Sequence, residues 1–190
     1  MSDKRTQADF SKHELIVKEF DIDGKKLTIH HFKQRDSHNL EVKITNFDGN
    51  CTITGDLGNY IACREFIPTA NNIISDYYFC EKLTTYSTQK VFEFDANSQI
   101  IELAKWEKEL LEDITNEDEI EEIKEQFTPL FDACKNGSQQ ELEVELYNSD
   151  LEFDEFQPEQ KIETWLLMIF DAFEEIGRRL AEKEKKEVAE

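Results

Sequence analysis

The stretch that decides the fold runs from residue 50 to residue 66 and reads NCTITGDLGNYIACREF. Two short runs of β-branched and aromatic residues, Cys51–Thr54 and Tyr60–Phe66, flank a segment rich in glycine, aspartate and asparagine. β-Branched and aromatic residues favour a pleated, half-buried strand. Glycine, aspartate and asparagine supply the positive φ angles that a chain reversal needs. The stretch therefore predicts a β-hairpin.

Three further strands are predicted before this hairpin. Ile16–Ile22 alternates in the manner of a strand, the turn signal Asp23-Gly24 follows, and Leu27–Phe32 returns. Residues 40–44 alternate apolar and polar side chains in a third strand, after a polar loop over residues 35–39. Five strands joined by short turns predict an antiparallel meander.

The second half of the chain predicts helices. Apolar residues recur at helical spacing in Gln99–Leu111, and further helices are expected over Tyr77–Leu83, over Glu117–Cys134 with an interruption at Pro129, and over Gln139–Tyr147. The most regular apolar stripe follows Pro158 and extends from Ile162 to Leu180, so this helix is expected to pack on the sheet or on Gln99–Leu111.

The predicted fold class is thus α+β, with an N-terminal antiparallel β-meander of about five strands covered by C-terminal helices. The expected divisions are a flexible tail (1–12), a sheet with a short helix (13–95) and an acidic helical region ending in a long amphipathic helix (96–190). No apolar run is long enough for a membrane helix, and the four cysteines show no C-x-x-C spacing. We therefore expect a soluble, reduced protein of the cytoplasm.

The negative charge is unevenly placed along the chain. The net charge is −21, and residues 101–160, with 20 acidic and 4 basic side chains, account for −16 of it. Aromatic residues such as Phe127 and Tyr147 are interspersed among these acids. Most acidic runs are only solvated helix faces, but this asymmetry favours a surface that binds a partner. The predicted partner-binding acids are Glu117, Asp118, Glu119, Glu121, Glu122, Glu125, Glu141, Glu143, Glu145, Asp150, Glu152 and Asp154.

Other kinds of site find little support in the sequence. The cysteines, Cys51, Cys63, Cys80 and Cys134, lie mostly among strand or helix residues and are interpreted as buried, inert thiols. His30 and His31 are adjacent in a predicted strand, so they should point to opposite faces and could not easily bind one metal ion. Residues 55–59 lack the ending of a phosphate-binding P-loop and are interpreted as a turn. We expect no catalytic residue, no metal and no cofactor.

Three segments resemble small uncharacterised proteins encoded by bacteriophages and prophages. They are Ile53–Tyr60 with its Thr-Gly-Asp-x-Gly turn, Cys63–Pro68, and Ser75–Leu83, and the likeness covers roughly residues 40–85 with a looser echo in Trp165–Leu180. The resemblance implies an accessory protein of a phage or mobile element, acting in the bacterial host cell. It transfers no active-site residue.

Three functional hypotheses follow. In the first, the acidic surface mimics DNA and occupies a basic nucleic-acid-binding groove of a host defence nuclease, as an anti-CRISPR inhibitor of a CRISPR effector would. In the second, the amphipathic helix over Trp165–Leu180 mediates assembly, for example as a homodimer. The third, an enzyme acting on a small molecule or nucleotide, would need a polar pocket such as one between the sheet and the last helix. Direct nucleic-acid binding is disfavoured because phosphates would repel this chain.

Overall fold

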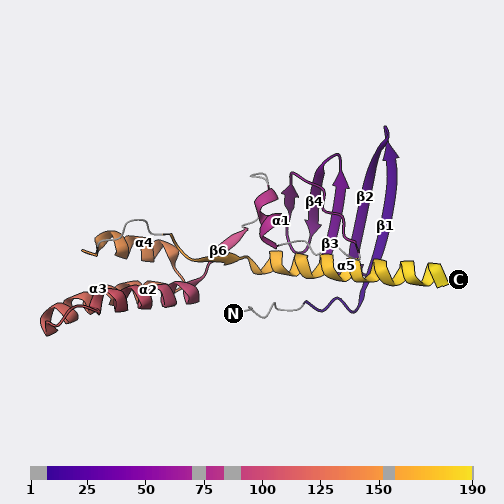
Figure 1. The fold of residues 1–190 in the computed structure, drawn as a ribbon. Helices are drawn as coiled ribbons and strands as arrows, with labels where there is room; N and C mark the ends of the chain where they lie inside the picture. The colour runs from indigo at the N-terminus through magenta and orange to yellow at the C-terminus, as the bar shows by residue number, and fades with distance from the viewer. Residues whose placement is uncertain (1–7, 70–75, 84–90, 152–156, 190) are drawn as a thin grey trace. The chain divides into compact units, whose positions relative to one another are not determined.

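A computed structural model describes residues 8–69, 76–83, 91–151 and 157–189 (Figure 1). The chain forms two compact units. The first, here called the sheet unit, contains residues 1–91 and 162–190, and the second, the helical unit, contains residues 92–161. The division differs from the one expected from the sequence, because the last helix belongs with the sheet and not with the acidic helices.

The sheet unit is built on the predicted antiparallel meander. Its five strands lie in sequence order and are β1 (His13–Ile22), β2 (Lys25–Gln34), β3 (Ser37–Phe47), β4 (Asn50–Gly55) and β5 (Tyr60–Ala62). The turn between β1 and β2 uses Asp23 and Gly24, both with positive φ (52° and 76°), which matches the twist of a two-residue hairpin. The meander and the α+β class are confirmed.

The hairpin over residues 50–66 is also confirmed, although its second strand ends at Ala62. Ile44 pairs with Ile53, and Ile53 pairs with Tyr60, so this hairpin extends the sheet from β3. Gly55 has a φ of 137°, and a Cβ atom there would lie 2.1 Å from the backbone oxygen of Glu41. Residues 55–59 are therefore a turn that requires glycine, as the sequence indicated.

One face of the sheet carries the core. Helix α5 (Thr164–Ala189) crosses the strands (Figure 1) and buries the apolar residues Leu166, Ile169 and Ile176 against them. Helix α1 (Asp76–Lys82) adds Phe79, which is fully buried among aromatic rings. Phe10 is 5% exposed and packs against Phe32, and Ala8 also contacts this core, where a flexible tail was expected.

The helical unit is formed by α2 (Ala96–Leu111), α3 (Glu117–Lys135) and α4 (Gln139–Asn148). Leu103, Phe127, Leu130 and Leu142 make up most of its small buried core. Strands β6 (Phe92–Phe94) and β7 (Gln160–Ile162) pair with each other where the chain enters and leaves this unit. None of the helices that the structure describes is long and apolar enough to cross a bilayer.

Helix α2 begins at Ala96 where Gln99 was predicted, and α3 and α5 also differ from the prediction. Pro129 lies inside a continuous α3, since burial of Phe127 and Leu130 on either side of it offsets its cost of about 3 kcal/mol. The last helix begins at Thr164 and not at Pro158, because residues 160–162 pair as β7. The Glu163 carboxylate accepts hydrogen bonds from the backbone N–H groups of Trp165 (2.7 Å) and Leu166 (3.3 Å) and so caps α5.

Candidate interaction surface

The helical unit concentrates the charge of the protein. Its 70 residues include 22 acidic and 5 basic side chains, a net charge of −17, whereas the sheet unit has 21 acidic and 17 basic side chains, a net of −4. The difference in basic residues is larger than the difference in acidic ones. The helical unit is therefore distinguished by the scarcity of cations that could neutralise its carboxylates.

The first group of predicted acids occupies the N-terminal half of α3. Asn116 caps this helix, accepting a hydrogen bond from the backbone N–H of Asp118 at 3.1 Å, and the acids of the first turn also favour the helix N-terminus electrostatically. Asp118, Glu121 and Glu125 follow at spacings of three and four residues, which places them in one row about 4.5 and 6 Å apart along the helix axis. All six predicted acids of α3 are exposed, namely Glu117, Asp118, Glu119, Glu121, Glu122 and Glu125.

The remaining described acids lie on α4 and just after it. Glu141 and Glu143 are exposed near the turn that joins α3 to α4, and Glu145 is half-buried. The backbone N–H of Asp150 donates to Oε1 of Gln126 at 3.0 Å, which brings Asp150 beside the middle of α3. The predicted acids thus form two groups, one on the N-terminal half of α3 with Asp150 near it, and one at the α3–α4 turn. Glu152 and Asp154 lie outside the described residues.

These carboxylates have few internal partners. Within the described ranges, none of the ten forms an ion pair, while the ion pairs of the helical unit involve other acids, such as Glu102 with Lys105 and Asp132 with Lys135. Glu143 accepts a hydrogen bond from Gln139 (2.8 Å) and Glu141 one from Asn136 (3.4 Å). Apart from the half-buried Glu145, these acids are exposed to solvent.

An aromatic side chain stands among the acids on α4. Tyr147 is 87% exposed, and Val144 on the same outward side of this helix is 51% exposed. Tyrosine is enriched at protein interfaces, because its ring is apolar and its hydroxyl can form a hydrogen bond. Helix α4 contributes Leu142 and Leu146 to the core of the unit, and Tyr147 lies outside this core.

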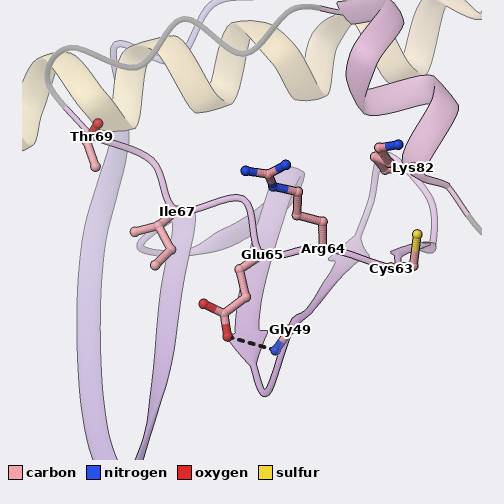
Figure 2. A pocket seen from close by; sticks show the side chains of 7 residues that line it. All are labelled: Gly49, Cys63, Arg64, Glu65, Ile67, Thr69 and Lys82. Atoms are coloured by element: carbon pink, nitrogen blue, oxygen red, sulfur yellow. Dashed lines mark hydrogen bonds between the residues drawn. The ribbon is translucent and has the colours of Figure 1, made fainter.

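A second feature, a cavity in the sheet unit, was missed by sequence reasoning. It has a volume of about 790 Å³ and is lined by residues that include Cys63, Arg64, Ile67, Thr69 and Lys82 (Figure 2). The interpretation of all four cysteines as buried thiols is wrong for Cys63, which is exposed, although Cys51, Cys80 and Cys134 are buried. The reason is that β5 ends at Ala62, so Cys63 follows the strand instead of pointing into the core.

The histidines also depart in part from expectation. His30 is buried and His31 is half-exposed on the opposite face, as predicted for neighbours on a strand, and burial lowers the pKa of His30. His13 is also buried, which the sequence did not indicate, and its Nε2 lies 3.1 Å from the backbone oxygen of Asn39. In the part of the chain that the structure describes, no three His, Cys, Asp or Glu side chains are grouped so as to hold a metal ion.

The two alternative hypotheses both concern helix α5 and the sheet that it covers. The middle of the interface between the sheet and α5 is filled by buried apolar residues such as Leu166, Phe170 and Phe173. At its edge, β1 and α5 form a pocket of about 560 Å³ that is lined by Leu15, Val17, Glu19, Arg179, Leu180 and Lys183. The apolar stripe of α5 is thus buried in the core of the sheet unit, although Trp165 is 50% exposed. In comparisons with protein-family models, curated proteins and solved structures, nothing matched this chain.

Proposed function

We propose that this protein acts by protein–protein interaction, and that its helical unit binds a basic groove in which the partner otherwise holds nucleic acid. The observation that carries the proposal is the segregation of charge, with a net of −17 on the helical unit and −4 on the sheet unit. A surface that served solubility alone would gain nothing from this separation. A surface that competes with phosphates needs unpaired carboxylates in one place.

The row on α3 and the tyrosine on α4 supply two different kinds of contact. Asp118, Glu121 and Glu125 offer regularly spaced negative charges to lysine and arginine side chains of the partner. Each lysine or arginine that pairs with one of these carboxylates is no longer available to a phosphate of nucleic acid. Tyr147 offers an apolar ring that can be buried at the contact. The narrower form of the proposal is an inhibitor of a CRISPR effector or another defence nuclease, and its support is the likeness to phage-encoded proteins.

The experiment is affinity capture from a bacterial lysate with three forms of the full chain. The native protein is compared with an Asp118→Asn/Glu121→Gln/Glu125→Gln variant and with a control variant, Glu109→Gln/Glu112→Gln/Asp113→Asn. The control removes the same three charges from exposed positions at the end of α2 and just after it. We expect the native protein and the control to capture the same nucleic-acid-binding protein, and the α3 variant to lose it. Equal capture by all three forms, or capture of no such protein, contradicts the proposal.

A further inference from the structure

The cavity in the sheet unit brings two cations to one aromatic ring. The guanidinium carbon of Arg64 lies 5.4 Å from the ring centroid of Tyr78, and Nζ of Lys82 lies 5.2 Å from the same centroid. Arg64 also donates a hydrogen bond to the Tyr78 hydroxyl. Both cations line the cavity, so it has a positive wall in a protein whose net charge is −21.

The acids nearby leave much of this positive charge available. Among the described residues Arg64 has no carboxylate partner, whereas Lys82 is paired with Glu81 at 2.5 Å and keeps further N–H donors. Glu65 also lines the cavity, but it points to the other side of the loop from Arg64 and accepts a hydrogen bond from the backbone N–H of Gly49 at 3.1 Å (Figure 2).

The loop that carries Arg64 is held in place by buried contacts. The side chain of Asn46, which is 1% exposed, donates to the backbone oxygen of Phe66 (2.9 Å) and accepts from its N–H (2.7 Å). The backbone N–H of Cys63 donates to the oxygen of Lys82 at 2.9 Å, which ties the loop to the end of α1. These contacts hold the backbone on both sides of Arg64, which reduces the entropy that the loop would lose on binding a ligand.

We propose that this cavity binds a phosphate group, either free phosphate or the phosphoryl group of a small metabolite. A planar guanidinium and an ammonium are side chains that proteins often use to bind phosphate. The pocket is wide open to solvent, so a phosphate bound at its cationic wall could carry a further chemical group. The proposal concerns the sheet unit and does not depend on the acidic surface.

Cys63 provides the readout because it is the exposed thiol at the cavity, while the other three cysteines are buried. The rate at which a neutral alkylating reagent modifies Cys63 in the native protein is measured by mass spectrometry. Inorganic phosphate, adenosine monophosphate, sodium acetate and sodium chloride are compared at one ionic strength. We expect phosphate to slow the reaction in a saturable manner that acetate and chloride do not reproduce. Protection by adenosine monophosphate at lower concentration assigns the site to a phosphate ester, and equal potency assigns it to free phosphate.

Three substitutions and one control test the assignment. Arg64→Gln should raise the phosphate concentration needed for half-protection about tenfold or more, since a hydrogen bond to a charged group is lost. Arg64→Lys should restore part of the affinity, and Lys82→Gln should weaken it as well. The matched control, Arg35→Gln, removes one positive charge from the turn before β3, outside the cavity, and should leave protection unchanged. The proposal is overturned if chloride slows the reaction as much as phosphate does, or if protection is unchanged in Arg64→Gln and Lys82→Gln. If Arg64→Gln does not fold, the result for Lys82→Gln decides.

Discussion

The two units of this chain differ in the size of their buried core and in their net charge. In the sheet unit, nineteen buried residues form the core among those described, and its acidic and basic side chains nearly balance. In the helical unit, seven buried residues support a net charge of −17. A small core under strong self-repulsion is a costly way to build three helices. The proposed contact with a partner would account for that cost, while the sheet unit obtains its stability from burial.

The largest expected effect separates the units by their cores. Phe79 is fully buried, with ring centroids of Phe66 at 4.7 Å and Phe170 at 5.4 Å, so Phe79→Ala should destabilise the sheet unit by about 3–5 kcal/mol. Denaturant unfolding followed by Trp165 fluorescence in a Trp106→Phe background measures this, because Trp165 lies in the sheet unit and Trp106 in the helical unit. A loss below about 1 kcal/mol would show that the core is not organised around Phe79.

The corresponding change in the helical unit is Leu130→Ala. Leu130 is fully buried, and its truncation should cost about 2–5 kcal/mol, seen by Trp106, which packs on Phe127 with ring centroids 5.0 Å apart. The background is then Trp165→Phe. If Leu130→Ala moved the Trp165 transition of the sheet unit as strongly as the Trp106 transition, the contrast between two separate cores would be wrong.

A smaller effect distinguishes the units by pH. Burial lowers the pKa of His30 below its usual value of 6.5, an effect that Glu19 partly opposes. As the pH falls below about 6.5, the unfolded chain takes up a proton that folded His30 does not, so the stability of the sheet unit decreases. His30→Leu should reduce this decrease between pH 7.5 and pH 5. An identical pH dependence in the variant and the native protein would contradict the role of His30.

The smallest expected effect is a gain in stability, whereas the preceding substitutions in the cores cause a loss. Glu121 lies three or four residues from Asp118 and Glu125, and like charges at these spacings destabilise a helix by about 0.2–0.5 kcal/mol each. Glu121→Gln should therefore stabilise the helical unit by roughly 0.4–1 kcal/mol, and added salt should reduce this gain by screening. Thermal unfolding at low and high salt checks it. A destabilised variant would mean that Glu121 serves the fold.

Much of the sheet could be predicted from the sequence, because its signals are local. Asp23-Gly24 and the Gly55 turn each require backbone angles that few residues adopt, and they set the order of the strands. The start of α5 could not be predicted, because the pairing of β6 with β7 depends on residues about 70 positions apart. The interruption predicted at Pro129 was wrong for a similar reason, since burial of its neighbours in the tertiary structure outweighs the cost of a proline inside a helix.

The two candidate sites also differ in how far they could be predicted from local sequence signals. The acids of α3 are visible in the sequence as composition, and the helix period shows which of them share a row. The cavity joins Arg64 to Lys82 through the contact between the end of β5 and the end of α1, where Ala62 bridges Leu83. No local pattern encodes that contact. An exposed cysteine next to an arginine, directly after a strand, is the signal that could have indicated it.

The measurement that tests the account most directly is competition between this protein and duplex DNA for the partner that the native protein and the α2 control capture. The purified partner is titrated with the full chain at several concentrations of unlabelled duplex. We predict mutually exclusive binding, so that the apparent dissociation constant rises in proportion to the DNA concentration and Asp118→Asn/Glu121→Gln/Glu125→Gln no longer displaces DNA. A ternary complex of the partner, DNA and this protein would contradict the claim that its acidic surface takes the place of nucleic acid.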